Sequence, residues 1–75
     1  MTADETLDLR GLKCPLPALL ARRVLLHAAP GSVIEVLCDD PLCHIDLPHM
    51  CRQESIEILA EERSDLLTRL VLRRS

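Results

Sequence analysis

Two prolines separated by a single residue, Pro15 and Pro17, stand directly behind a stretch that alternates apolar and polar side chains. A proline fixes its backbone φ at about −65° and lacks a backbone N–H, so the strand that this alternation predicts for residues 7–10 cannot continue through them. Proline is well tolerated in the first turn of a helix, where the N–H would have no intrahelical partner. The spacing therefore predicts a strand, a turn at Gly11 and a helix over residues 15–28.

The rest of the chain continues this mixed pattern. Alternating or β-branched side chains predict three more strands, at residues 33–38, 55–61 and 66–73. Asp39, Asp40 and Pro41 have the composition of a helix start, which predicts a second helix over residues 41–53 with a kink at Pro48. The order β-α-β-α-β-β predicts an α+β fold, a two-layer α/β sandwich in which two helices cover one face of a four-stranded mixed sheet.

Helical and strand spacing also predict which side chains face the core. The expected stripe on the first helix is Pro17, Leu20, Ala21, Val24 and Ala28. The expected stripe on the second helix is Cys43, Leu47, Met50 and Cys51. Period-two alternation assigns to the inner face of the last two strands Ile56, Ile58, Ala60, Leu70 and Leu72.

The chain has 75 residues and a formal net charge of −3, and it contains no Phe, Trp or Tyr. This length predicts one domain spanning residues 1–75. Proteins that bind nucleic acids usually carry a basic excess and stack bases on aromatic side chains, so direct nucleic-acid binding is disfavoured. The N-terminus does not have the pattern of a signal peptide, and the apolar runs are too short to cross a bilayer. We therefore expect a cytoplasmic protein with no membrane contact, whose four cysteines stay reduced.

Cys14 is the candidate reactive residue. Helix N-termini and nearby cations lower the pKa of a thiol, and Arg10 and Lys13 stand close by in the sequence. Pro15 and Pro17 are expected to hold the cysteine on a rigid helix tip, with Gly11 providing the sharp turn. This pattern predicts an exposed sulfur that readily loses its proton, although a cysteine at this place can also simply cap a helix, and most cysteines in small proteins are buried in the core.

The stretch from Leu7 to Arg74 resembles the TusA-like (SirA-like) sulfur-carrier family. The residues that carry the resemblance are Leu7 to Pro17, then Pro30-Gly31, Asp39-Asp40-Pro41, Asp46-Leu47-Pro48 and Cys51. The resemblance implies the same β-α-β-α-β-β sandwich. It also implies that Cys14 accepts sulfur as a persulfide from a cysteine desulfurase or rhodanese-type donor, with Pro15 and Pro17 as its scaffold and no cofactor. The implied acceptors are proteins of tRNA thiolation, molybdenum-cofactor assembly or sulfur metabolism.

Three positions depart from this family pattern. Leu16 stands where tRNA-thiolation carriers often have Glu, and Ile45 stands where some members have a basic residue. Glu54-Ser55 precedes the third strand, where a glycine is often found. These departures leave the chemistry of Cys14 untouched and leave the identity of the acceptor open.

The sequence also predicts a docking surface and leaves two alternative functions open. We expect partner proteins to meet an apolar patch with a basic rim on the first helix, made of Leu16, Leu19, Arg22 and Arg23. One alternative function is a metal-binding module that uses Cys38, Cys43, His44, His49 and Cys51. Helical spacing argues for core packing of those cysteines instead, with His44 and His49 at the surface and His27 at a helix end. The other alternative is a non-catalytic regulatory adaptor.

Overall fold

The structure is a computed structural model that describes residues 4–74. The elements follow one another in the predicted order β-α-β-α-β-β. The strands are β1 (Glu5–Asp8), β2 (Val33–Cys38), β3 (Glu57–Arg63) and β4 (Thr68–Arg73). The helices are α1 (Leu16–His27) and α2 (Cys43–Gln53). Both helices end within a residue of the predicted place, and β2 has the predicted bounds.

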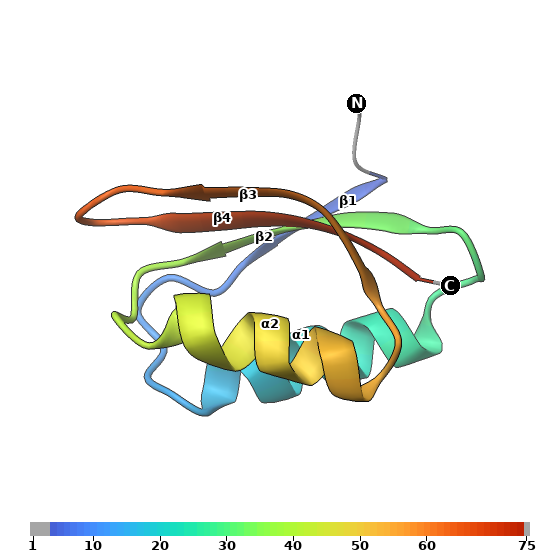
Figure 1. Cartoon of the computed structure of the whole chain (residues 1–75), viewed down its shortest axis with the longest axis horizontal. Coiled ribbons are helices and arrows are strands. Elements are labelled where there is room, and N and C mark those ends of the chain that lie inside the picture. Colours follow the sequence, from blue (N-terminus) through green and yellow to red (C-terminus); the bar gives the residue numbers. More distant parts are fainter. Residues whose placement is uncertain (1–3, 75) are drawn as a thin grey trace.

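The four strands form one mixed sheet in the spatial order β1-β2-β4-β3. The β1 and β2 strands are parallel because α1 connects them as a crossover, whereas β4 runs antiparallel to both of its neighbours. Both helices lie on the same side of this sheet (Figure 1). The predicted α+β two-layer sandwich is confirmed.

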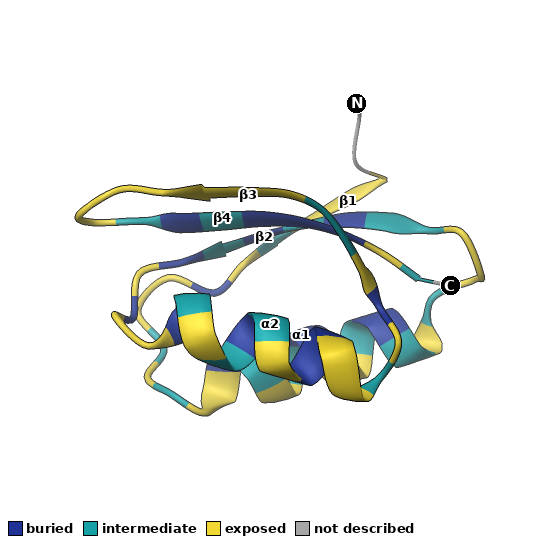
Figure 2. Ribbon diagram, viewed as in Figure 1, coloured by how far each residue is buried: buried dark blue, intermediate teal, exposed yellow. Residues whose placement is uncertain are grey.

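The core lies between the sheet and the two helices (Figure 2). All four side chains predicted for the inner stripe of α2 are buried. On α1 the buried residues are Pro17, Ala21 and Leu25, while the predicted Leu20, Val24 and Ala28 are half-buried. Leu25, which the predicted stripe omitted, is fully enclosed. The buried side chains of α1 are thus spaced four residues apart and form a narrower face than the predicted one.

The prediction that Ala60 faces the core is wrong. The register of β3 against β4 shifts between Ile58 and Ala60, so that Ile58 pairs with Leu72 and Ala60 with Val71. The extra residue of this β-bulge breaks the period-two alternation. Ile56 is buried and Ile58 half-buried, as expected, but Ala60 is exposed. Leu70 and Leu72 in β4 are fully buried, as predicted.

The end of α2 contains a residue in the left-handed region. Ser55 has φ +58°, and the N–H of Ile56 donates a hydrogen bond of 2.8 Å to the carbonyl of Cys51. A helix that ends in this way favours glycine at the left-handed position. The glycine that is often found before the third strand in the family would adopt this left-handed conformation without strain at position 55.

A disulfide joins Cys38, the last residue of β2, to Cys43, the first residue of α2. Their Cα atoms are 6.5 Å apart. Both residues are buried, so their predicted place in the core is confirmed. The expectation of four reduced cysteines is wrong for this pair, because the short loop between the two elements brings their side chains together.

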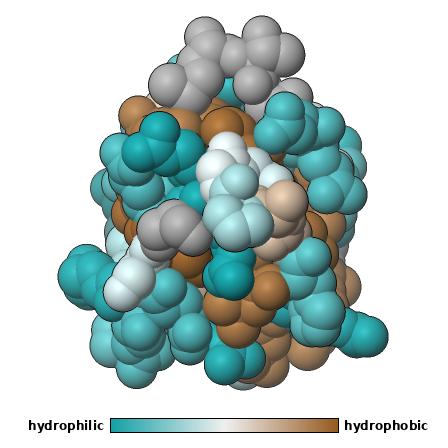
Figure 3. All heavy atoms as spheres, turned by 90° about the vertical axis from the view of Figure 1, so that its right-hand side faces the viewer, coloured by the Kyte–Doolittle hydropathy of each residue, from teal (hydrophilic) through white to brown (hydrophobic). Residues whose placement is uncertain are grey.

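The two ends of the sandwich differ. Both helices begin at the same end of the molecule (Figure 1), and Cys14 belongs to the loop that precedes α1. Figure 3 shows the opposite end, where hydrophilic side chains cover the flanks and hydrophobic ones are seen between them. Within residues 4–74, no helix is both long and apolar enough to span a membrane.

Candidate functional site

The loop between β1 and α1 places Cys14 at the start of the helix. Gly11 turns the chain with φ +89°, a conformation that glycine adopts without strain, which confirms its predicted role in the turn. Pro15 is the N-cap residue of α1, and Pro17 is buried in its first turn. Cys14 therefore directly precedes the helix cap, and the peptide bond to Pro15 is cis. Its side chain is half-buried.

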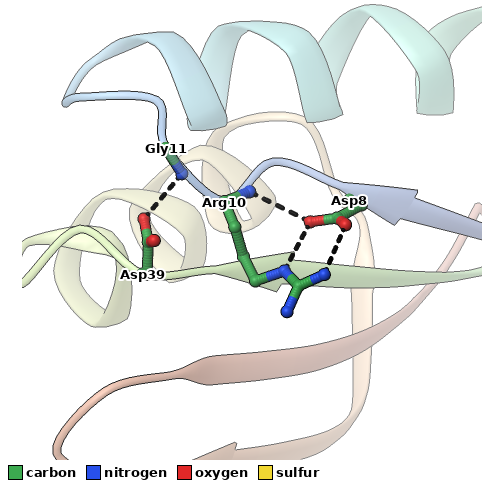
Figure 4. Close-up of polar contacts among 4 residues, drawn as sticks. All are labelled: Asp8, Arg10, Gly11 and Asp39. Carbon is green, nitrogen blue, oxygen red and sulfur yellow. Dashed lines mark hydrogen bonds and ion pairs between the residues drawn. The ribbon is translucent and has the colours of Figure 1, made fainter.

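Two neighbouring carboxylates after β2 hold this loop. One oxygen of Asp39 accepts a hydrogen bond of 2.9 Å from the backbone N–H of Gly11 (Figure 4). Asp40 is 8% exposed, and its Oδ2 accepts a hydrogen bond of 3.2 Å from the backbone N–H of Cys14. Its Oδ1 accepts another of 2.9 Å from the N–H of Leu42, the residue that caps α2. The Asp39-Asp40 pair thus fixes the start of α1 to the start of α2.

A third carboxylate contacts the sulfur itself. Asp46 lies in the first turn of α2 and is half-buried, and its Oδ2 accepts a hydrogen bond from Sγ of Cys14. The thiol must carry its proton to donate this bond, because a carboxylate is an acceptor only. The two helices therefore begin beside each other, with a thiol from one loop facing an acid from the other helix.

This contact reverses the expected acidity of Cys14. The hydrogen bond to Asp46, burial, and the negative charges of Asp46 and Asp40 together raise the pKa of the Cys14 thiol to about 11. The prediction of a sulfur that readily loses its proton is therefore wrong. A helix N-terminus favours an anion, but an acidic side chain in direct contact with the sulfur has the larger effect.

Cys14 opens onto a groove of about 410 Å³ between α1 and α2. The wall formed by α1 and the loop before it is mostly apolar, with Cys14, Pro15, Ala18, Leu19 and Arg22. The α2 wall is more polar, with Asp46, His49, Met50 and Gln53. The sulfur is therefore accessible from one side, although it is not fully exposed. A reactant that approaches along the groove meets the sulfur and the Asp46 carboxylate together.

A sequence model of the family described as Sulfurtransferase TusA matches residues 5–74. The chain belongs to the TusA family. Among solved structures, the chain is similar to a crystal structure of a SirA-like protein from Desulfitobacterium hafniense. The two share 25% sequence identity with a TM-score of 0.72, over 92% of this chain and 95% of that one. Membership of the TusA family supports a general role as a sulfur carrier or sulfurtransferase.

The cations expected to support the TusA-family cysteine act elsewhere. Arg10 forms an ion pair of 2.8 Å with Asp8 in β1, and its side chain extends along the sheet (Figure 4). The Arg10 guanidinium holds the pKa of Asp8 down at about 2. Lys13 is exposed, and its charge helps the N–H groups of Leu42 and Cys14 to lower the pKa of Asp40. The idea that Arg10 and Lys13 lower the pKa of Cys14 is not supported.

Of the four residues predicted as a partner surface, Leu19 and Arg22 line the groove, whereas Leu16 and Arg23 do not. Leu16 and Leu19 are 47% and 55% exposed, which is high for leucine, and Leu19 lines the groove. Arg22 also lines the groove and forms an ion pair of 2.8 Å with Glu54 at the end of α2. Arg23 is exposed, and its carbonyl lies 2.7 Å from Nδ1 of His27, which places that histidine at the helix end as predicted.

The cysteines and histidines between positions 38 and 51 have separate environments. Cys38 and Cys43 are bonded to each other, so their sulfurs do not exist as the thiolates that a zinc site would use. Cys51 is buried in the core, and burial raises its thiol pKa to about 11. His49 is exposed and lines the groove, whereas His44 is half-buried. Across residues 4–74, no group of three or more potential ligands is arranged to hold a metal ion.

Sequence reasoning missed the three acids that build the site. Asp39 and Asp40 were interpreted as a helix start, and Asp46 only as part of the family pattern. The available signal was the occurrence of three acids near the start of α2, two of them side by side. Their contacts with Gly11 and Cys14 span at least 26 residues of sequence, so local periodicity does not reveal them.

Proposed function

We propose that this protein is a sulfur carrier that accepts sulfur on Cys14 as a persulfide and delivers it to an acceptor protein. The placement of Cys14 supports this role: a half-buried thiol at a helix start, open to a groove between two helices. Of the two free thiols in the described residues, Cys51 is enclosed in the core, so Cys14 is the one that a donor can approach.

The transfer needs no external oxidant or reductant. Sγ of Cys14 attacks the outer sulfur of a donor persulfide, and a new sulfur–sulfur bond forms. The bond between the outer and inner sulfurs of the donor breaks, and its electron pair leaves with the donor thiolate. Donor persulfide and Cys14 thiol become donor thiol and Cys14 persulfide. An acceptor thiolate then attacks the outer sulfur of Cys14 in the same way.

The donor is proposed to be a cysteine desulfurase or a rhodanese-type enzyme, as the family resemblance implies. Acceptors in tRNA thiolation, molybdenum-cofactor assembly and sulfur metabolism remain predictions of that resemblance. Leu16 and Ile45 bear on this choice, because they expose apolar side chains where some related carriers have charged ones. We therefore propose an acceptor whose contact with this end of the protein is more apolar than that of a tRNA-thiolation partner.

The site assignment is tested by mass measurement. The protein is incubated with glutathione persulfide, excess donor is removed, and the intact mass is recorded. We expect one added sulfur atom in the native protein and in Cys51→Ala, and none in Cys14→Ser. An equal adduct in Cys14→Ser would place the accepting sulfur elsewhere, and the absence of any adduct in the native protein would favour the regulatory adaptor.

The partner surface is tested with a pair of leucine variants. Leu19→Glu introduces a charge into the wall of the groove and is expected to slow sulfur transfer from a protein donor at least tenfold. Leu66→Glu is the matched control, because Leu66 is 83% exposed in the turn between β3 and β4. Equal transfer rates in the two variants would reject the proposed surface. Transfer from glutathione persulfide should change less, because a small donor needs little of the helix surface.

A further inference from the structure

We propose that Asp46 is the proton acceptor for Cys14, taking the thiol proton onto Oδ2 as the sulfur attacks the donor. This inference rests on the proposed function and assigns to the site a second residue with a chemical role. It starts from one contact: the thiol of Cys14 donates a hydrogen bond to Asp46 before any reactant arrives. A general base must be within hydrogen-bond reach of the proton that it removes, and Asp46 meets that condition.

The other charged groups around the sulfur are occupied or differently placed. The Asp40 carboxylate accepts backbone hydrogen bonds from Cys14 and Leu42 with its two oxygens. Lys13, in the loop before α1, is a cation and cannot accept a proton. On the groove walls, Arg22 of α1 is paired with Glu54, and His49 of α2 is exposed. Asp46 is the acid in direct contact with Sγ.

A proton acceptor solves a specific difficulty of this site. With a thiol pKa of about 11, roughly one molecule in ten thousand carries a thiolate at pH 7. Attack by that small fraction alone would be slow, since the thiolate is the competent nucleophile. If the proton moves to Asp46 during the attack, the abundant thiol form reacts. A positioned acid or base typically accelerates such a step by about 10²–10⁴-fold.

The step balances without a further reactant. The S–H bond of Cys14 breaks, its proton goes to Oδ2 of Asp46, and its electron pair forms the new bond to the outer sulfur of the donor. The donor's sulfur–sulfur bond breaks, and the donor thiolate leaves. Asp46 then returns the proton to that thiolate or to water, and the carboxylate is restored. The sum is again donor persulfide plus thiol giving donor thiol plus Cys14 persulfide.

The pH dependence of transfer distinguishes a proton acceptor from a merely electrostatic neighbour. Single-turnover transfer from glutathione persulfide is measured between pH 7 and 9 for the native protein and for Asp46→Asn, whose amide cannot take the proton. The ratio of the variant's rate to the native rate cancels the ionisation of the donor. If Asp46 accepts the proton, only the variant depends on free thiolate, and we expect this ratio to rise about tenfold per pH unit.

A constant ratio across that range would overturn the inference, because both proteins would then react through the thiolate. Asp46→Glu, which restores a carboxylate, should flatten the ratio again. Glu5→Gln also removes one negative charge, at an exposed position at the start of β1 that does not line the groove, and its rate should equal that of the native protein. His49→Gln, made in both backgrounds, should leave the slope unchanged, which excludes this groove residue as the proton acceptor. If the native protein gains sulfur on Cys14 but the rate ratio is constant, only the role of Asp46 is rejected. If Cys14→Ser gains the same sulfur, the proposed function of Cys14 is itself rejected.

Discussion

Asp40 accepts a hydrogen bond from the backbone N–H of Cys14, across 26 residues of sequence. The same carboxylate caps the N–H of Leu42, so one buried side chain joins the starts of α1 and α2. These bonds are made best by the ionised form, and the N–H groups of Leu42 and Cys14 lower the pKa of Asp40 below its ordinary value. The position of Cys14 therefore depends on the charge of a carboxylate that does not contact its sulfur.

The first prediction concerns acid. Because the folded-state pKa of Asp40 is lower than its unfolded-state value of about 3.9, its contribution to stability is present above that value and is lost as the pH falls through the folded-state pKa. Asp40→Asn should therefore be less stable than the native protein at pH 7, and the difference should shrink below about pH 4. Urea unfolding midpoints at pH 7 and pH 3 measure this. A difference that is the same at both pH values would contradict the proposed role of the charge, and Glu5→Gln, at an exposed position at the start of β1, serves as the control.

The second prediction concerns the two free thiols. The pKa values of Cys14 and Cys51 are both raised to about 11, the first mainly by the hydrogen bond to Asp46 and the second by burial. Asp46→Asn should lower the pKa of Cys14 toward its ordinary value by one to two units, on the order of what removal of an adjacent charge produces, and leave Cys51 unchanged. Titration of the two Cβ resonances by ¹³C NMR reports both sites in one sample. Parallel movement of both resonances would show a general change in folding instead.

The third prediction concerns the bond between Cys38 and Cys43. The native protein should show two free thiols after unfolding without reductant, and four after reduction. In the chain-entropy description, a cross-link over a separation of five residues stabilises the fold by about 2 kcal/mol. Reduction should therefore lower the free energy of unfolding by about this amount. The double variant Cys38→Ala/Cys43→Ala should not respond to reductant; four free thiols before reduction would show that the bond does not form.

The fold was predictable from local patterns because each element carries its own signal. Alternation marked the strands, spacings of three and four marked the inner face of α2, and Pro15 with Pro17 marked the start of α1. These signals depend on neighbours within one or two turns. These signals did not predict the bulge in β3. The residues of β3 have an ordinary strand composition, and the unpaired Leu59 changes only the face of the sheet on which Ala60 lies.

The candidate residue could be chosen from the sequence, but its acidity could not. Cys14 was identified from the adjoining prolines, but its acidity is set by Asp46, 32 residues away. Reasoning from the nearest charges in sequence chose Arg10 and Lys13, and the fold pairs Arg10 with Asp8 instead. The disulfide was missed for a related reason. Reduced thiols were expected from the predicted cytoplasmic location, whereas the bond depends on the approach of β2 to α2.

The last prediction concerns Ser55, which ends α2 in the left-handed region at φ +58°. This conformation costs a residue with a side chain about 1–2 kcal/mol, and glycine avoids that cost. Glycine also gains freedom in the unfolded chain, which offsets about 0.4–1 kcal/mol of the benefit. The first effect is larger, so Ser55→Gly should raise the free energy of unfolding by about 0.5–1 kcal/mol in urea titrations. Ser55→Ala removes the hydroxyl but keeps Cβ, so it should be no more stable than the native protein. Stabilisation by alanine equal to that by glycine would mean that the backbone conformation is not the cause.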